Sequence, residues 1–413
     1  MNNSTMPKLR FKIDPSKPIK LVNFVEIMEA GTDGIKRGPF GGALKKEIFV
    51  EEGFAVYEQQ HAIYKKFDDV RYFIPSDKYQ ELISFRLQPG DIIMSCSGTI
   101  GKIALFPSNA KEGVINQALI RFRAKVGEVD NVYLRYLLES DYMQKNMTGK
   151  NPGSAIKNLI SVSELKQIKV PLFPQDEQSK IASFFSLIDQ KIESQQEKLR
   201  QVELLKKGIM KRILNREIEF KDENGHNYPD WNMKSFGEIS KKVGPKNSKG
   251  GEYPVYSISN KFGFIPQSEQ FEESRLEDLD KSSYKIVTKG QFAYNPARIN
   301  VGSIGLMRLD EPVIVSSLYV CFELSEEMNN EFVNQYFKSD FFQREVLRNL
   351  EGSVREYLFY ENFSNVNIYV PSFKEQQKIA DCLILFDKKI EIEMRKLELL
   401  RQFKIGLMQQ IFG

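Results

Sequence analysis

Few residues in this chain have types and spacings suited to catalysis. The only two histidines, His61 and His226, lie far apart in the sequence, so a histidine-based metal site or catalytic triad is not expected. The three cysteines, Cys96, Cys321 and Cys382, are widely separated and lack the spacing of a zinc site. Their odd number argues against a disulfide framework and favours a reducing compartment, the cytoplasm. The sequence therefore predicts no catalytic residues, no metal ligands and no cofactor in this chain.

Three short motifs resemble catalytic or phosphate-binding loops only in part. The segment CSGTIGK (96–102) lacks the spacing of a Walker A phosphate loop, and GPFGG (38–42) lacks that of a dinucleotide-binding fingerprint. The segment NPAR (295–298) is comparable to the Asn-Pro-Pro-aromatic loop of amino-methyltransferases, which stacks an aromatic ring on a flipped base. Arg298 stands where that ring is required. All three motifs are interpreted as turns.

The strongest pattern in the chain is a long repeat. Residues 177–214 and 375–412 align without a gap at an offset of 198 residues. A repeat period near half the chain length indicates two copies of one unit. Residues identical in the two copies include Ile181, Ala182, Asp189, Lys191, Ile192, Glu193, Lys198, Leu199, Lys206, Gly208, Met210 and Ile213, which recur as Ile379, Ala380, Asp387, Lys389, Ile390, Glu391, Lys396, Leu397, Lys404, Gly406, Met408 and Ile411.

Each repeated segment predicts a long helix with an apolar seam. Apolar residues alternate three and four positions apart, which is typical of two helices packed as a coiled coil. Both seams are interrupted at equivalent polar positions, Gln195 and Lys206 in one copy, Glu393 and Lys404 in the other. The alternative is two ordinary amphipathic helices, each packed on its own domain. The seam comprises Ile181, Phe185, Ile188, Ile192, Leu199 and Val202, with Ile379, Leu383, Phe386, Ile390, Leu397 and Leu400.

The helix ends and two internal glycines give further expectations. Asp176 is a plausible N-cap of the first helix, and Ser372 with Glu375 predicts a capping box for the second. Gly208 and Gly406 each cost about 1 kcal/mol relative to alanine inside a helix. Their recurrence suggests the close approach of another backbone, or alternatively a frayed helix end.

The remaining segments predict two similar α+β domains. Short β-branched stretches punctuated by glycine and proline recur, as in 87–105 and 287–306, and indicate strands and turns. Residues 132–147 and 331–347 each read as one amphipathic helix. The expected organisation is a first domain (1–173), a first long helix (174–215), a second domain (216–373) and a second long helix (374–413), the helices forming an antiparallel coiled coil with pseudo-two-fold symmetry.

Composition favours a soluble, cytoplasmic protein. Hydrophobic residues make up 41% of the chain, no apolar run approaches a membrane span, and the first residues lack the apolar region of a signal peptide. The net charge is only +4, from 59 basic and 55 acidic residues, and does not by itself indicate nucleic acid. Local pairs such as Lys45-Lys46 can contact phosphates without carrying sequence information.

Taken together, the order of these segments resembles the specificity subunit (S, or HsdS) of type I restriction–modification systems. The resemblance rests on 170–199 and 370–397, on the entry segment FKDENGHNYPDW (220–231), and on the SGTIGKIAL (97–105) and GSIGL (302–306) strands, and it spans essentially the whole chain. It implies two target recognition domains that each read one half of an asymmetric, split site in double-stranded DNA, while the helices set the spacer.

The resemblance also implies partners that perform the chemistry. Two modification subunits would supply S-adenosylmethionine and the methyl-transfer site, and restriction subunits would use ATP and Mg²⁺. The chain itself would be non-catalytic. Two alternatives remain: a stand-alone DNA methyltransferase or nuclease, and a scaffold protein with no role on DNA.

Base contacts are expected from polar residues on the loops between strands. Glutamine and asparagine pair bidentately with adenine, and arginine or lysine with guanine. The candidates are Lys36, Arg37, Lys45, Lys46, Gln59, Gln60, Asn116 and Gln117 in the first domain, and Lys246, Lys249, Asn260, Lys261, Arg298, Asn300, Ser316 and Arg355 in the second.

Overall fold

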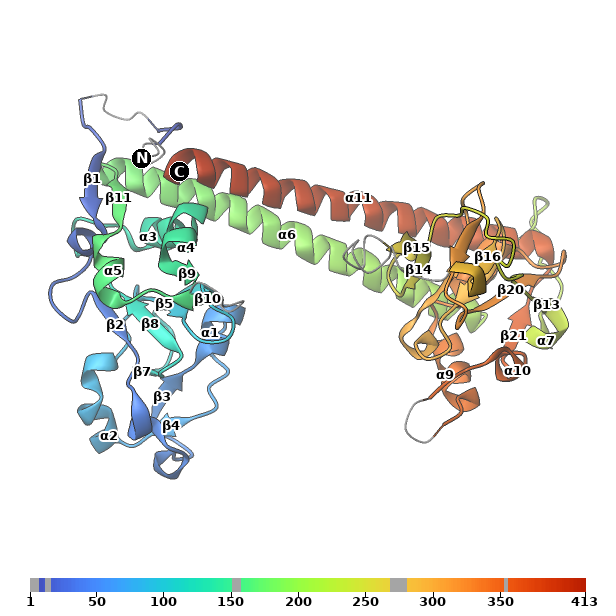
Figure 1. Cartoon of the computed structure of the whole chain (residues 1–413), viewed down its shortest axis with the longest axis horizontal. Helices are drawn as coiled ribbons and strands as arrows, with labels where there is room; N and C mark the ends of the chain where they lie inside the picture. Colours follow the sequence, from blue (N-terminus) through green and yellow to red (C-terminus); the bar gives the residue numbers. More distant parts are fainter. Residues whose placement is uncertain (1–6, 12–15, 151–156, 268–280, 353–355) are drawn as a thin grey trace. The chain divides into compact units, whose positions relative to one another are not determined.

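The structure is a computed structural model that describes residues 7–11, 16–150, 157–267, 281–352 and 356–413 (Figure 1). The chain divides into two compact units. The first comprises Met1–Gln196 and Arg395–Gly413, and the second comprises Glu197–Met394. Two helices of 40 residues each, α6 (Gln175–Leu214) and α11 (Phe373–Phe412), contribute to both units. Each unit thus holds one globular domain, half of one long helix and half of the other.

The first unit is built on two small sheets. One has the strand order β2-β8-β5-β6, all antiparallel, and the other has the order β4-β3-β7, in which β3 and β7 run parallel. A separate antiparallel pair, β1-β11, brings the first and the last strand of the domain together. The strands are β1 (Lys20–Asn23), β2 (Ile35–Arg37), β3 (Phe54–Tyr57), β4 (Phe73–Ile74), β5 (Ile92–Ser95), β6 (Ile103–Leu105), β7 (Gly113–Ile115), β8 (Leu119–Phe122), β9 (Thr148–Lys150), β10 (Lys157–Leu159) and β11 (Lys169–Leu172).

The second unit repeats this plan. Its four-stranded sheet has the order β13-β20-β17-β18, and the pairs β14-β15, β16-β19 and β12-β21 complete the domain. The strands are β12 (Asn232–Ser235), β13 (Ser240–Val243), β14 (Tyr256–Ser259), β15 (Gly263–Pro266), β16 (Lys285–Val287), β17 (Phe292–Tyr294), β18 (Ile304–Leu306), β19 (Val313–Val315), β20 (Val320–Leu324) and β21 (Asn367–Val370). The mixed α+β class that the sequence predicts is confirmed for both domains.

The shorter helices correct one expectation. Residues 132–147 and 331–347 do not form one helix each, because a serine ends the first helix and starts another. Ser140 Oγ accepts the N–H of Met143, and Ser339 Oγ accepts the N–H of Phe342, so both serines are N-caps. The helices are α1 (Gln59–Tyr64), α2 (Ser76–Glu81), α3 (Asn131–Glu139), α4 (Asp141–Met147) and α5 (Val162–Gln167) in the first unit, and α7 (Phe236–Ile239), α8 (Asn330–Tyr336), α9 (Asp340–Asn349) and α10 (Tyr360–Phe363) in the second.

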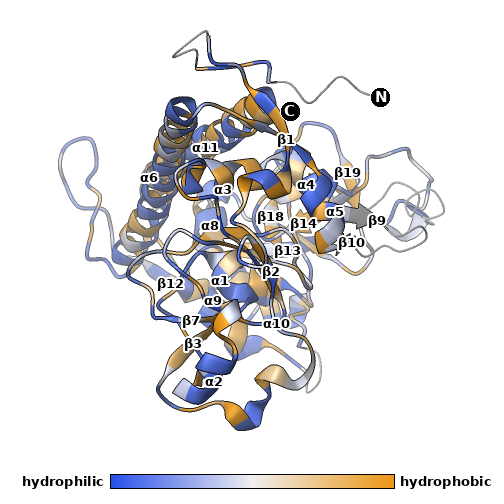
Figure 2. Ribbon diagram, turned by 90° about the vertical axis from the view of Figure 1, so that its left-hand side faces the viewer, coloured by the Kyte–Doolittle hydropathy of each residue, from blue (hydrophilic) through white to orange (hydrophobic). Residues whose placement is uncertain are grey.

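Each long helix packs on the globular domain and on the other helix at the same time. In the first unit, Ile181 and Phe185 of α6 share one core with Met408 and Ile411 of α11 and with α3. In the second unit, α11 and α6 exchange these roles. The helices run antiparallel in each unit (Figure 1), and hydrophilic and hydrophobic residues alternate along them (Figure 2). All twelve predicted seam residues are buried or half-buried. Several of them also belong to the core of a globular domain. Packing of the helices on each other and packing on the domains therefore occur together.

The two lysines that interrupt the seam form ion pairs between the helices. In the first unit, Lys404 Nζ lies 2.6 Å from Asp189 Oδ1, and Tyr136 donates to Oδ2 of the same carboxylate at 2.7 Å. In the second unit, Lys206 Nζ lies 2.6 Å from Asp387 Oδ1. These positions are equivalent in the two copies, which explains why both the lysine and the aspartate recur in the sequence.

The start of each long helix is tied to its domain by a buried glutamine. The side chain of Gln178 accepts the N–H of Asp130 at 2.9 Å and donates to the carbonyls of Phe173 and Glu128 at 2.8 and 3.1 Å. Gln376 makes the equivalent three hydrogen bonds in the second unit. The repeated glutamine therefore fixes the angle at which each helix leaves its domain.

The helix ends differ from the expectation in two details. Helix α6 begins at Gln175, so Asp176 lies in its first turn and is not the N-cap. Ser372 Oγ does accept the N–H of Glu375, at 3.4 Å, but the Glu375 carboxylate accepts the indole N–H of Trp231 at 3.0 Å and does not close the predicted capping box. The equivalent carboxylate, that of Glu177, binds Arg10 at 2.6 Å.

The two helix glycines do not meet another backbone. A Cβ atom added at Gly208 or Gly406 would have no heavy atom within 4 Å. The predicted close approach is therefore wrong for the chain's own residues. Both glycines lie inside their helices, each six residues before the last helical residue.

The ion pair in the first unit gives an acid-sensitivity prediction. Burial by itself would raise the pKa of Asp189, but hydrogen bonds from Lys404 and Tyr136 and the charge of Arg135 outweigh it and lower the pKa below its ordinary value. A carboxylate with a lowered pKa contributes stability above about pH 4, and this contribution is lost as the pH falls through the folded-state pKa. We expect Asp189→Asn to lower the melting temperature at pH 7 and to flatten its decline between pH 5 and pH 3.

The control for this prediction is Glu193→Gln, which removes an exposed carboxylate from the same helix. It should leave the melting curve at pH 7 and its acid dependence close to those of the original chain. Identical acid dependence of the Asp189→Asn variant and the original chain would contradict the assigned role of Asp189.

Candidate nucleic-acid interface

Several predicted contact residues of the first domain meet at one edge of its sheets. Strands β2 and β5 end at this edge and β8 begins there, since Arg37 pairs with Ile120 and Ser95 with Leu119. The loop from Cys96 to Lys102 leaves β5 at the same edge. Strands β3 and β7 run parallel and end nearby, so the segments that follow them reach the same place.

Close backbone contacts hold these loops together. The N–H of Asn116 donates to the carbonyl of Tyr57, which places the ends of β3 and β7 side by side. A Cβ atom at Gly38 would lie 1.8 Å from the Asn116 carbonyl oxygen, so only glycine fits there. The side chain of Gln59 lies 3.6 Å from the Cβ position of Gly98. The edge therefore combines Gln59, Asn116 and the 96–102 loop.

Arg37 also lies at this edge and is half-buried. Its guanidinium lies over the Phe40 ring at 5.4 Å and faces the thiol of Cys96. Burial raises the pKa of the Cys96 thiol, and the Arg37 charge opposes this only in part. Asn116 accepts the N–H of Ala118 at its own turn, while Gln117 is exposed. Asn116 and Gln117 lie in the turn between β7 and β8, whereas Arg37 ends β2 and Gln59 and Gln60 begin α1, so the expectation of loop positions holds for only part of this set.

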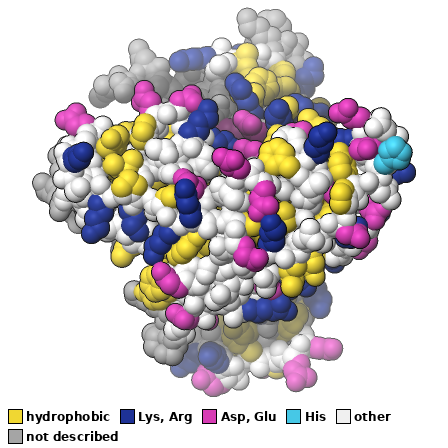
Figure 3. Space-filling model, turned by 90° about the vertical axis from the view of Figure 1, so that its right-hand side faces the viewer, with side chains coloured by type: hydrophobic (Ala, Val, Ile, Leu, Met, Phe, Trp, Pro, Cys, Tyr) yellow, Lys and Arg dark blue, Asp and Glu magenta, His cyan; other side chains and the backbone are white. Residues whose placement is uncertain are grey.

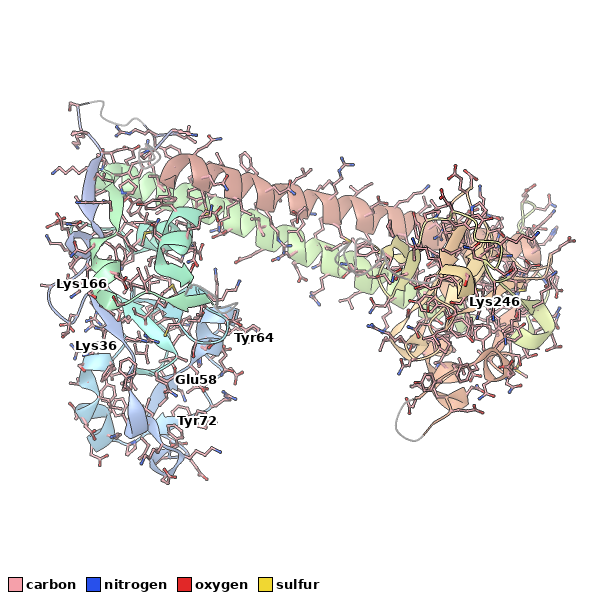
Figure 4. The ribbon with its side chains drawn as sticks, viewed as in Figure 1. Lys36, Glu58, Tyr64, Tyr72, Lys166 and Lys246 are labelled. Atoms are coloured by element: carbon pink, nitrogen blue, oxygen red, sulfur yellow. The ribbon has the colours of Figure 1, made fainter. Side chains whose placement is uncertain are left out.

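The other candidates of the first domain lie elsewhere. Lys36 lies over the Phe85 ring at 4.6 Å and on a different side of the domain from Tyr64 of α1 (Figure 4). Lys45 and Lys46 are exposed on a short helical segment that packs against Val56 and Tyr79. The structure thus separates the lysines from the glutamines and asparagines, although the sequence placed them in one group.

The corresponding edge of the second domain contains a polar pocket of about 260 Å³. Strands β14, β17 and β19 all end there, which brings Asn260, Arg298 and Ser316 together as pocket-lining residues. Gln267, Tyr256 and Tyr319 also line it but were missed by the sequence analysis. They carry no motif, and the pairing of β14 with β15 places Gln267 beside Val255, at the start of β14, so the pocket extends along the hairpin from there to Asn260.

The remaining candidates of the second domain are dispersed. Lys246, labelled in Figure 4, and Lys249 are exposed before β14, and Lys261 is exposed at the β14-β15 turn. Asn300 is half-buried, and its carbonyl accepts a hydrogen bond from the Gln343 side chain of α9. Arg355 lies outside the described residues.

The electrostatics of the described surface are mixed rather than strongly basic. Figure 3 shows lysine and arginine side chains interspersed with aspartate and glutamate on the face that it presents. Within the described residues, no group of three histidine, cysteine, aspartate or glutamate side chains is placed to hold a metal ion. No described helix is long and apolar enough to cross a membrane.

These domains match a known family along most of the chain. The family model described as "Type I restriction modification DNA specificity domain" matches residues 41–204 and again 229–402. The chain therefore belongs to the family of type I restriction–modification specificity subunits.

Curated relatives and solved structures agree with this assignment. The chain is 25% identical over 334 residues to the type I restriction enzyme MjaVIII specificity subunit of Methanocaldococcus jannaschii, covering 77% of each chain. It is also 25% identical over 358 residues to the putative MjaX specificity subunit of the same organism, covering 81% of this chain and 80% of the relative.

Two solved structures share the fold over nearly their whole lengths. The S subunit of a type I restriction–modification system from M. genitalium has a TM-score of 0.53 at 18% identity and covers 99% of both chains. A chain from a study of complex assembly and conformational transition of the type I R-M system has a TM-score of 0.61 at 14% identity. It covers 97% of this chain and 99% of its own length.

Proposed function

We propose that this chain reads an asymmetric, two-part sequence in double-stranded DNA for a type I methyltransferase and restriction complex. The observation that carries the proposal is the equivalence of the two loop edges. In each unit, the segments that follow equivalent strands (β3 and β14, β5 and β17, β7 and β19) come together at one edge, where uncharged amides and one arginine gather. Amides and guanidinium groups supply the paired donors and acceptors that distinguish base edges in the major groove.

The different residues gathered at the two edges support the reading of two different half-sites. Gln59 and Asn116 characterise the first edge, whereas Asn260, Gln267 and Arg298 characterise the second. Two linked domains add their discrimination, since each wrong base pair costs about 1–3 kcal/mol. One chain with two unlike domains would therefore recognise a site that is long enough to be rare.

We further propose that two identical modification subunits bind the long helices. Each unit exposes apolar side chains at equivalent helix positions: Leu187 and Phe403 in the first unit, Leu385 and Leu205 in the second, all between 54% and 65% exposed. Exposed apolar residues that recur in both copies mark a surface used twice. The open space beside Gly208 and Gly406 lies on the same two helices.

In this proposal the chain contributes recognition and the partners contribute chemistry. The modification subunits bring S-adenosylmethionine and the methyl-transfer site, and the restriction subunits use ATP and Mg²⁺. The chain would be non-catalytic. A stand-alone methyltransferase or nuclease would instead modify or cleave DNA without these partners.

The test is a comparison of methylated adenines in cells that express the modification subunit with and without this chain. We expect a two-part methylated motif only when the chain is present. Methylation of the same adenines without the chain would overturn the proposal. So would a reconstituted complex that binds all DNA sequences equally well, because that result would favour a scaffold role.

A pair of substitutions in the first domain should relax one half-site. Replacing Gln59 and Gln60 by alanine removes amides at the loop edge, of which Gln59 faces the 96–102 loop. We expect degenerate bases in one half of the methylated motif and an unchanged second half. The discrimination lost should be about 1–3 kcal/mol for each base that is no longer read.

The matched control replaces Lys45 and Lys46 by alanine in the same domain. These exposed lysines lie apart from the glutamines, and we expect them to contact phosphates, so the double substitution should weaken binding evenly and leave the motif unchanged. An unchanged motif in the glutamine variant would remove both glutamines from the list of base contacts.

A further inference from the structure

The polar pocket of the second domain has features of a site that holds a ligand. Its volume of about 260 Å³ lies just below the 300–1,000 Å³ typical of drug-sized sites. Two tyrosines, Tyr256 and Tyr319, form part of its wall, and among the described residues that line it none is acidic. Arg298 is the one charged group in that lining. The pocket is thus suited to a small, planar, polar group that carries no positive charge.

Several polar groups of the pocket are already satisfied within the protein. Ser303 Oγ donates to the carbonyl of Ile258 at 2.8 Å. Asn295 Oδ1 accepts the N–H of Ala297 at 3.1 Å and shapes the turn. Such groups form the wall of the pocket and have little capacity left for a ligand.

Gln267 differs from these residues. Its Oε1 atom is buried and has no hydrogen-bond partner among the described residues, while its backbone N–H is fixed by the carbonyl of Val255 at 2.9 Å. A buried carbonyl oxygen without a donor is unfavourable, and native structures rarely keep one unless another molecule supplies the donor. A ligand that presents a hydrogen-bond donor to Gln267 would satisfy this oxygen.

The donor and acceptor atoms of the Gln267 amide restrict the class of ligand further. A phosphodiester group has no donor for Oε1, and a metal ion would lack the carboxylates that it prefers. A nucleobase that presents a donor and an acceptor side by side satisfies both atoms of the amide. Adenine does so on its major-groove edge, where N6 donates and N7 accepts.

We propose that Gln267 determines specificity in the second half-site by pairing with one adenine, its Oε1 accepting from N6 and its Nε2 donating to N7. This inference rests on the proposed function and names a base and a residue for it. The pocket receives the edge of that base between the β14-β15 hairpin and the loop that carries Arg298. Tyr256 and Tyr319 supply a rigid wall that keeps the amide in place.

The experiment uses the whole chain reconstituted with its modification subunit. A panel of duplexes carries every single-base change in the second half of the motif found for the original complex, and methylation rates are measured on each. Gln267→Ala should reduce the preference for adenine at one position by about 10-fold to 100-fold. Gln267→Glu, which can only accept, should shift the preference at that position toward cytosine, whose N4 is a donor.

The matched control is Gln291→Ala, at the opposite end of β17. The Gln291 amide already hydrogen-bonds the N–H of Thr288 and the carboxylate of Glu323, so its loss should not alter the base preference. The first half-site, read by the other domain, serves as an internal control for folding in every variant.

The outcomes separate this inference from the function on which it rests. Altered preference at one position of the second half-site supports the assignment of Gln267. Unchanged preferences in both Gln267 variants, with the two-part motif intact, would overturn the assignment but leave the proposed function standing. Methylation that shows no dependence on this chain would overturn the proposed function itself.

Discussion

Adding four residues to both long helices is expected to lengthen the spacer between the half-sites by about two base pairs and to leave the bases unchanged. Four helical residues add roughly 6 Å and rotate the following segment by about 400°, close to one whole turn. The apolar seam therefore keeps its direction. The structure places the insertions between Gln196 and Glu197 in α6 and between Met394 and Arg395 in α11, where the two compact units adjoin in both helices.

The ends of the helices are less suitable sites for such an insertion. Leu214, at the end of α6, packs against the core of the second domain, and Glu375, at the start of α11, binds Trp231. Extra residues there would disturb the attachment of the domain. Insertion between the units avoids both contacts.

Sequencing of methylated adenines reads the outcome of the length series directly. Insertions of one or two residues in both helices serve as controls, because they rotate the seam by about 100° or 200° and should abolish assembly. If the four-residue variants assemble but keep the original spacer, the helices only carry the modification subunits, and another contact sets the distance.

Replacing the buried glutamine Gln376 by leucine is expected to destabilise the second unit by about 3–5 kcal/mol. The substitution removes three hydrogen bonds and leaves the part-buried N–H of Asn329, the part-buried carbonyl of Glu327 and the buried carbonyl of Pro371 without these partners. Because this N–H belongs to the N-cap of α8, faster hydrogen exchange in α8 should accompany a lower melting temperature. The first unit, which has Gln178 in the equivalent place, should keep its protection.

The neighbouring residue gives a matched control. Gln377→Leu removes an amide that is exposed and bonds only to other side chains, so its effect should be about 0.5 kcal/mol or less. Equal destabilisation by the two substitutions would show that Gln376 has no special role in attaching the helix.

The long-range organisation could be predicted from the sequence because regularly spaced apolar residues predict the two long helices. The helices extend over 40 residues each, without an internal proline, and their seam positions are buried or half-buried as a 3–4 spacing requires. The family resemblance followed from the same pattern and is confirmed. The break at Ser140 was missed because an apolar stripe continues through it, whereas the capping hydrogen bond is visible only in three dimensions.

The candidate sites could be predicted only in part because strand pairing decides which loops meet. Gln59 and Asn116 are far apart in sequence, yet the parallel pair β3-β7 places both at one edge. Arg121 is a basic residue with a structural role, because it is fully buried and donates to the carbonyls of Arg86 and Asp33. The equivalent position of the second domain holds Cys321. No rule based on residue type separates such an arginine from one that contacts DNA.

The contact between residues 8–9 and the end of α11 has a consequence for circular permutation of the chain. The N–H groups of Lys8 and Leu9 donate to the carbonyl of Gln410, just as those of Glu217 and Ile218 donate to the carbonyl of Arg212. The first domain therefore follows the last helix in space as directly as the second domain follows the first helix. Residues 8–9 and the end of α11 in the first unit thus make the same connection as residues 217–218 and the end of α6 in the second unit. A circularly permuted gene, in which the present ends are joined and the chain is opened after α6, would encode the same two domains in the reverse order.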